Sequence, residues 1–169
     1  LLPALTSYRA DQEWRTVEVQ GRYLRGDQLL VRDRVHNGHP GFEVVTPFRL
    51  TDGRVFVLDR GWVSIGTTQD RPDFVPPAPT GTVTVTARLQ ANEGALKGRY
   101  APKGEIPSVD LAAIAKEVGQ PTYTGAYGQV RTETPAAATA PKRLAPHVTS
   151  TGVDEGTHLS YAIQWIIFA

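Results

Sequence analysis

A histidine and two aromatic residues near the end of the chain have the spacing of a cofactor site. His158 precedes an uncharged apolar run, and Tyr161 and Trp165 follow it at positions i+3 and i+7, on one side of a helix. The helix macrodipole disfavours a positive charge at the first turn, so the His158 imidazole stays neutral and keeps a lone pair for a metal. His158 could therefore ligate iron, while Tyr161 and Trp165 cover a porphyrin edge. Alternatively, they form an aromatic belt at a membrane interface.

A second pair of histidines has the H-x-x-H spacing of a metal clip. His36 and His39 flank the dipeptide Asn37-Gly38. A structural metal site needs about four ligands, and neither cysteine nor a cluster of carboxylates accompanies this pair. We therefore interpret the four residues as the solvated tip of a hairpin.

The sequence Arg60-Gly61-Trp62 combines three residues with strong geometric roles. Gly61 permits an unusual backbone turn or a close approach, Trp62 brings a large area to bury, and Arg60 can pair with a carboxylate or bind carbonyls. This pattern favours a structural role. The alternative is a docking surface, because Trp and Arg dominate binding hot spots.

The C-terminal apolar run predicts a membrane anchor. Residues 159–169 carry no charge and follow a polar stretch over 149–157. A complete span needs roughly 20 residues, so these eleven residues would cross about half of the hydrocarbon layer. We expect a folded domain over 1–157 and the start of a truncated transmembrane helix over 158–169. A strand or short helix packed on a soluble core remains the alternative.

The rest of the chain reads mainly as β-strands. Residues 17–23 and 82–89 alternate apolar and polar side chains, the period of a half-buried strand. The Asn-Gly turn over 36–39 and the Asp-Gly turn over 51–54 each predict a hairpin. Val55–Leu58 is unbroken and apolar, which indicates a strand covered on both faces.

One helix and several connections complete the predicted elements. Residues 108–118 repeat apolar side chains at helical spacing, with Ser108 as the expected cap and Gly119 as the stop. Residues 92–107 and 133–146 are loop-like, and Pro47 requires an edge or a bulge in its strand. The fold class is therefore mainly β (α+β): a small antiparallel sheet, strongly curled or closed into a barrel, with one packed helix.

Composition and motifs exclude several classes of function. Lys+Arg 18 against Asp+Glu 17 gives a net charge of +1, and no basic block favours nucleic acid or an anionic surface as partner. The chain has no cysteine, hence no disulfide and no thiolate. There is no G-x-S-x-G elbow and no phosphate-binding loop. We do not expect an enzyme.

Three segments together are similar to a known family. Gly21-Arg-Tyr, the stretch 41–63 that contains Arg60-Gly61-Trp62, and His158-Leu-Ser-Tyr-Ala-Ile-Gln-Trp165 resemble the surfeit-locus family of cytochrome c oxidase assembly factors. Their order and spacing match over essentially the whole chain. The combination of the Arg-Gly-Trp hairpin with the His-Leu-x-Tyr-Ala-x-x-Trp segment carries most of the resemblance.

The resemblance implies two transmembrane helices that flank this domain and hold it on the extracytoplasmic side of a bacterial plasma membrane. It implies assistance to the maturation of a heme-copper oxidase, an association with heme a, and His158 as the proposed ligand. The expected partners are oxidase subunits or the heme a supplier, and the lipid bilayer through the flanking helices. The rival hypothesis is an extracytoplasmic β-barrel module that binds a ligand or a protein without heme.

Overall fold

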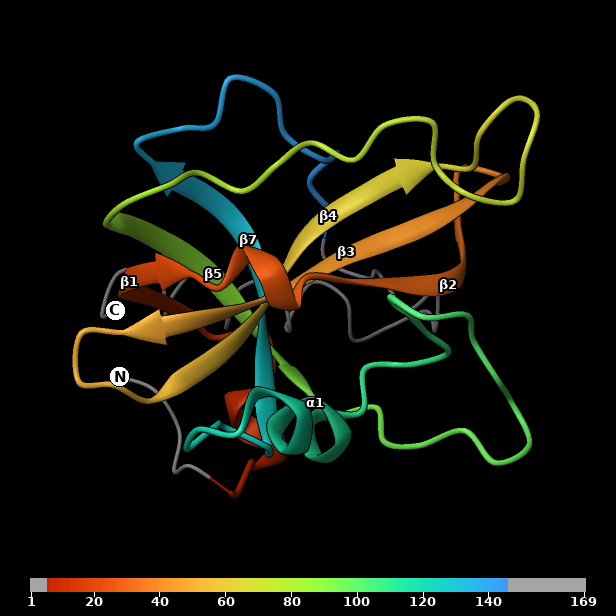
Figure 1. Ribbon diagram of the computed structural model, residues 1–169. Coiled ribbons are helices and arrows are strands. Elements are labelled where there is room, and N and C mark those ends of the chain that lie inside the picture. Colours follow the sequence, from red (N-terminus) through yellow and green to blue (C-terminus); the bar gives the residue numbers. More distant parts are fainter. Residues whose placement is uncertain (1–5, 146–169) are drawn as a thin grey trace, which may run out of the picture.

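The protein is described by a computed structural model over residues 6–145. The strands are β1 (Thr16–Tyr23), β2 (Leu29–His36), β3 (His39–Leu50), β4 (Val55–Ser64), β5 (Val83–Ala91), β6 (Glu105–Ile106) and β7 (Ala126–Thr134). One α-helix, α1 (Leu111–Val118), and two short 3₁₀ turns, Ala10–Gln12 and Arg25–Asp27, accompany them. The described chain is therefore mainly β with a single α-helix, as the sequence predicts (Figure 1).

Five of the strands form a closed barrel. Going round it, β1 pairs with β5, β5 with β7, β7 with β4, β4 with β3, and β3 returns to β1. Strands β2 and β6 extend the sheet beyond β3, outside the ring. The prediction of a barrel-like sheet is confirmed, but the prediction that it is antiparallel is wrong in part: β4–β7 and β2–β6 are parallel. Strand directions cannot alternate all the way round a ring with an odd number of strands, so closure requires a parallel pair.

Both predicted hairpins are present. The turn between β2 and β3 has Asn37 at φ 50° and Gly38 at φ 79°, the two positive angles of a type I′ turn. His36 and His39 are the last paired residues of that hairpin. The turn between β3 and β4 has Gly53 at φ 89°. These local signals therefore determine the β2–β3–β4 meander.

Pro47 lies where β3 changes partner on one edge. On that edge β2 pairs as far as Val45 and β1 begins at Phe48. The Leu24 backbone N–H donates to the Pro47 carbonyl at 2.8 Å, in the gap between the two partner strands. The N–H and the C=O of a strand residue point to the same side, so the proline nitrogen, which has no hydrogen to donate, also faces this gap. The prediction of an interrupted ladder at Pro47 is confirmed.

The cap of helix α1 (Leu111–Val118) lies two residues later than predicted. Asp110, not Ser108, is its cap: the Asp110 side chain accepts from the Ala113 backbone N–H. Ser108 instead donates its hydroxyl to the Gly94 carbonyl, tying the preceding loop to the helix start. At the other end Gly119 takes φ 70° and stops the helix, as expected.

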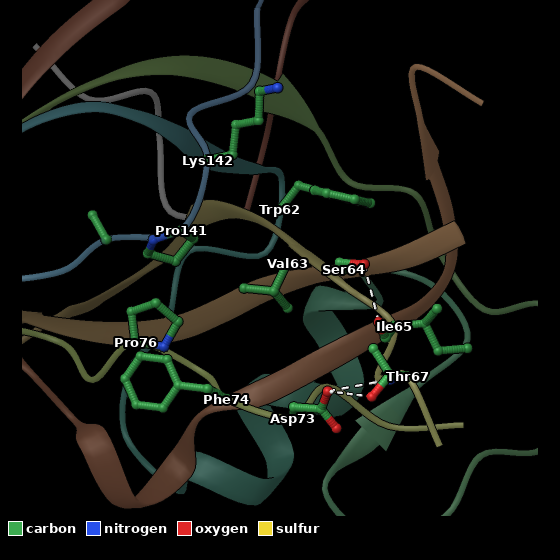
Figure 2. Close-up of a pocket in the computed structure, with 11 residues that line it drawn as sticks. Trp62, Val63, Ser64, Ile65, Thr67, Asp73, Phe74, Pro76, Pro141 and Lys142 are labelled. Carbon is green, nitrogen blue, oxygen red and sulfur yellow. Dashed lines mark hydrogen bonds between the residues drawn. The ribbon is translucent and has the colours of Figure 1, made fainter. Parts of the chain in front are cut away.

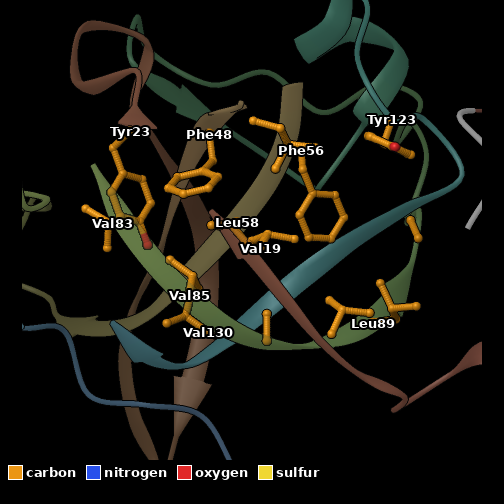
Figure 3. Close-up of a cluster of buried hydrophobic side chains, with 14 of the residues drawn as sticks. Val19, Tyr23, Phe48, Phe56, Leu58, Val83, Val85, Leu89, Tyr123 and Val130 are labelled. Carbon is orange, nitrogen blue, oxygen red and sulfur yellow. The ribbon is translucent and has the colours of Figure 1, made fainter. Parts of the chain in front are cut away.

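The apolar core has two main parts, one on each side of the barrel wall. The interior cluster takes Val17 and Val19 from β1 and alternate residues of β5, Val83 to Leu89, while their neighbours face outward (Figure 3). The outer cluster packs α1, through Leu111 and Ile114, against Val57. Strand β4 serves both clusters, because Phe56 and Leu58 face inward and Val57 outward. The prediction of a strand covered on both faces is confirmed.

Sequence reasoning missed two strands, the short β6 inside the predicted loop over 92–107 and the longer β7. The predicted loop over 133–146 begins inside β7, which ends at Thr134. The strand has no strict period of two: both faces of residues 126–130 are buried. Strand β7 lies between β4 and β5 and closes the barrel. The longer of the two strands that were not predicted is therefore the one that completes the ring.

The expected membrane segment lies outside the described residues. The boundary at 157/158 and the helix over 158–169 fall in that part of the chain. Among residues 6–145, we find no helix with the length and apolarity to span a bilayer.

The closing contact between β1 and β3 leads to a stability prediction. A Cβ at Gly21 would lie 2.0 Å from the Arg49 carbonyl oxygen, a backbone atom. We expect Gly21→Ala to destabilise the domain by about 2–3 kcal/mol in urea unfolding. The matched control is Gly26→Ala, where a Cβ would meet nothing within 4 Å, with an expected change within about 0.5 kcal/mol. Equal stabilities of the two variants would contradict tight closure at β1–β3.

Candidate functional site

A β-bulge in β4 brings Arg60, Gly61 and Trp62 into position. Val44 of β3 faces Gly61, but the next residue, Val45, faces Asp59, so Arg60 is the extra residue. Gly61 takes φ 130°, a conformation that side chains disfavour, and its N–H donates to the Asp59 carboxylate at 2.9 Å. The bulge therefore explains why glycine stands between two large residues.

The Arg60 guanidinium is completely buried and pairs with Glu133 of β7. Its Nε lies 3.0 Å and its Nη2 3.3 Å from the two Glu133 oxygens, while Nη1 donates to the Pro76 carbonyl at 3.0 Å. Both side chains are 0 % exposed. The guanidinium also lies over the Tyr23 ring, 5.4 Å from its centroid. This arrangement is the bidentate geometry in which a buried arginine is satisfied.

A second arginine completes this network. Arg143 donates through Nη2 to Glu133 at 3.0 Å and through Nη1 to the Arg60 carbonyl. The neighbouring Lys142 exchanges two backbone hydrogen bonds with Trp62, at 2.8 and 2.9 Å. Residues 140–143, which we call the strap, are thereby fastened along β4 after the bulge. Sequence reasoning found Arg60 but neither Glu133 nor Arg143, because both stand in the segment interpreted as a loop.

An open groove lies between the strap and the proline-rich segment over 71–81, which we call the proline-rich crossing. It encloses about 380 Å³, and its lining includes Trp62, Phe74, Pro76, Pro141 and Lys142 (Figure 2). Phe74 is 62 % exposed, which is unusual for a large apolar side chain. Pro76 holds Arg60 through its carbonyl, so one wall of the groove rests on the buried ion pair.

Trp62 reaches from this groove toward the β2–β3 hairpin. Its indole Nε1 donates to the Arg34 carbonyl at 2.9 Å, and its ring centroid lies 5.3 Å from that of His36. Gly41 makes room for it, because a Cβ there would lie 2.5 Å from the indole. The buried Arg60 is closed to a partner, whereas the half-buried Trp62 presents part of its surface to the groove.

The opposite face of β4 carries a buried pair of carboxyl groups. Asp59 is 1 % and Glu43 7 % exposed, and Arg34 lies 3.7 Å from Glu43. Burial, followed by the charge of Glu43 and a hydrogen bond with it, raises the pKa of Asp59 well above its usual value. Asp59 therefore keeps its proton at pH values where an exposed aspartate has lost it.

The other predicted site residues divide into two groups. His36 and His39 lie at the hairpin end, and no group of three metal-ligating side chains occurs among residues 6–145. His158, Tyr161 and Trp165 lie outside the described residues. The groove lining in the described chain contains no His, Cys, Met or Tyr, the side chains that ligate heme iron axially, so it does not fit heme.

Fold and site together define a small closed β-barrel domain with a strapped bulge and a groove beside it. The chain matches the SURF1 family over residues 1–169 and belongs to it, which confirms the resemblance noted in the sequence. SURF1-like proteins of Mycobacterium tuberculosis and Mycobacterium bovis are each 34 % identical to it over 172 residues, 99 % of this chain and 60 % of theirs.

A yeast relative matches a shorter part. The Saccharomyces cerevisiae protein named cytochrome oxidase assembly protein SHY1 is 36 % identical over 55 residues, which are 32 % of this chain and 14 % of the yeast protein. The chain spans 60 % of the length of the mycobacterial relatives.

The crowded position of Gly61 gives a prediction about the strap. A Cβ there would lie 2.3 Å from the Lys142 carbonyl oxygen, in addition to the strain of φ 130°. Gly53 has φ 89° and open space, so Gly53→Ala isolates the backbone strain. We expect Gly53→Ala to lower the free energy of unfolding by about 1 kcal/mol and Gly61→Ala by about 2 kcal/mol more. Equal losses in urea unfolding would show that the strap does not require this close approach.

The buried carboxyl pair predicts a pH dependence of stability. Because the pKa of Asp59 is raised in the folded state, folding retains a proton that the unfolded chain releases above about pH 4, and stability falls as pH rises through the folded pKa. Asp59→Asn keeps an acceptor for the Gly61 N–H but cannot ionise. We expect its unfolding free energy to fall less than that of the parent chain as pH rises above about 4, where the aspartate of the unfolded chain ionises.

The control for this titration is Asp70→Asn, which changes an exposed aspartate. It should leave the pH profile of urea midpoints parallel to that of the parent chain. Parallel profiles for the parent and Asp59→Asn would contradict a retained proton at Asp59.

Proposed function

We propose that the full-length protein is a non-enzymatic assembly factor for a heme-copper cytochrome c oxidase. The observation that carries this proposal is the match to the SURF1 family over the whole chain. The name of the yeast relative, a cytochrome oxidase assembly protein, supports it. The described site also fits a non-enzymatic role, because its buried charged residues bind one another and so hold the barrel together.

The protein is proposed to be anchored in the plasma membrane, with the barrel on the extracytoplasmic side. The uncharged run over 159–169 supports a membrane segment that follows the domain. In this arrangement the barrel stands beside the bilayer in which the oxidase core subunit is inserted. The proposed boundary between domain and anchor stays at 157/158.

Heme a is the proposed cofactor or cargo, with His158 as its ligand and Tyr161 and Trp165 beside it. Support comes from the family and from the i+3 and i+7 spacing of the aromatic residues. The groove does not take part in this binding, because its described lining offers iron no axial ligand. Heme contact is therefore assigned to the C-terminal segment, and protein contact to the barrel.

The groove is the proposed contact with an oxidase subunit or with the heme a supplier. Trp62 and the exposed Phe74 are aromatic residues of the kind that dominate protein interfaces, and the strap holds their surroundings in place. The same groove supports the second candidate function, a β-barrel module that binds a protein without heme. Only the heme a measurement below separates the two.

Deletion and complementation in the native bacterium test the assembly role. We expect deletion of the full-length gene to lower the membrane content of assembled oxidase, measured as heme a absorbance and as oxidase activity, and the intact gene to restore both. Normal oxidase content in the deletion strain would contradict the proposal.

The role of His158 is tested with the purified full-length protein and heme a. We expect His158→Ala to lose the bound optical spectrum, while His147→Ala, a histidine upstream of the apolar run, retains it. An unchanged spectrum in His158→Ala would remove the ligand assignment. If no protein variant binds heme a but the intact gene restores the oxidase, the heme-free module is favoured.

A further inference from the structure

A single loop gathers exposed apolar side chains and positive charges. Residues 94–104 follow β5 and project from the lower right of the molecule in Figure 1. Tyr100 is 90 % and Leu96 45 % exposed, two of the four exposed large hydrophobic residues of the described chain. Between Glu93 and Glu105 the loop has three cations, Lys97, Arg99 and Lys103, and no acidic residue.

Half of the lysines of the chain are clustered in this loop. The chain has four lysines, and two of them are Lys97 and Lys103, whereas its other cations are mostly arginine. No basic block is visible in the sequence, because Gly, Ala, Tyr and Pro separate the three charges. All three charges lie in one exposed loop, so the absence of a block does not exclude an anionic partner.

The two ends of the loop are held while its middle faces outward. The Gly94 carbonyl accepts from the Ser108 hydroxyl, and the Gly104 carbonyl accepts from the Leu30 N–H at 3.0 Å. Arg99 also contacts the sheet, because its Nη1 lies 3.5 Å from the carboxylate of Asp33 in β2. The loop is thus presented in a defined place by the barrel, with Leu96 and Tyr100 at the surface.

We propose that residues 94–104 form a contact site for the surface of an anionic lipid bilayer. Lysine and arginine near a bilayer are attracted to anionic headgroups, and a tyrosine ring resides at headgroup depth with its hydroxyl in water. Leu96 enters the boundary of the acyl region. A protein partner is less suited to this composition, since lysine is depleted in protein interfaces.

This contact would orient the barrel on the membrane independently of any flanking helix. It requires neither heme nor the oxidase, so its test and the tests of the proposed function can fail separately. The segment over 71–81, which lines part of the groove, crosses the top of Figure 1, apart from the loop, so the groove stays accessible to a protein while the loop touches lipid.

A fluorescent label tests insertion of the loop. The chain has no cysteine, so Tyr100→Cys accepts an environment-sensitive fluorophore at one position. In the chain of residues 1–169, we expect a blue shift on vesicles of phosphatidylglycerol and phosphatidylcholine at low salt, and none on phosphatidylcholine alone. Phe74→Cys, labelled in the same way, should stay in water. A label at position 100 that does not respond to anionic vesicles overturns the proposal.

Charge variants test the electrostatic part. We expect Lys97→Gln to weaken binding to the anionic vesicles about five-fold, and more salt to weaken it further. Lys116→Gln, the same change on the exposed face of α1, should leave affinity unchanged; residues 159–169 are present in every variant, so differences report the loop. Equal affinities of the two variants overturn the proposal. Binding of the loop to polyglutamate without any response to vesicles also overturns it and assigns the loop to an acidic protein surface.

Discussion

The buried ion pair between Arg60 and Glu133 is the constraint on which the described structure depends. It joins β4 to β7 across 73 residues of chain, beyond the end of the parallel β4–β7 ladder. Taking both charges out of water is costly, and the attraction offsets this only when every donor and acceptor is satisfied. Here the Pro76 carbonyl and Arg143 supply the remaining partners. The pair therefore fixes the proline-rich crossing and the strap together with the two strands.

The bulge in β4 also shapes the surface next to the buried ion pair. One extra residue in β4 allows the Arg60 side chain to reach Glu133, while the turned backbone at Gly61 lets the strap approach as closely as a strand would. Trp62, next in the chain, is left with one edge in the groove and its Nε1 bound to the hairpin. A groove built in this way is rigid because its walls are tied to a buried charge, which suits recognition of a protein surface.

Adjacent residues of β4 place an acidic and a basic side chain on opposite sides of the barrel wall. Arg60 lies with the Tyr23 ring of the interior cluster, whereas Asp59 faces Glu43 and the outer side, where α1 packs. The acidic side chain is accommodated by keeping its proton, and the basic one by a carboxylate partner. Both solutions serve packing. The residues left for contacts with other molecules are then Trp62, Phe74 and the exposed loop over 94–104, all of which border solvent.

The sequence by itself determined the local elements. Asn37-Gly38 and Asp52-Gly53 specified two hairpins, alternation specified β1 and β5, and Gly119 ended the helix, because each signal acts between residues close in the chain. It also identified the Arg60-Gly61-Trp62 segment and the family. The partner of Arg60 and the parallel closure through β7, by contrast, became visible only in the folded chain. Both features depend on contacts between segments that are distant in the sequence. Strand β7 is buried on both faces, so its sequence has no period of two from which the strand could be predicted.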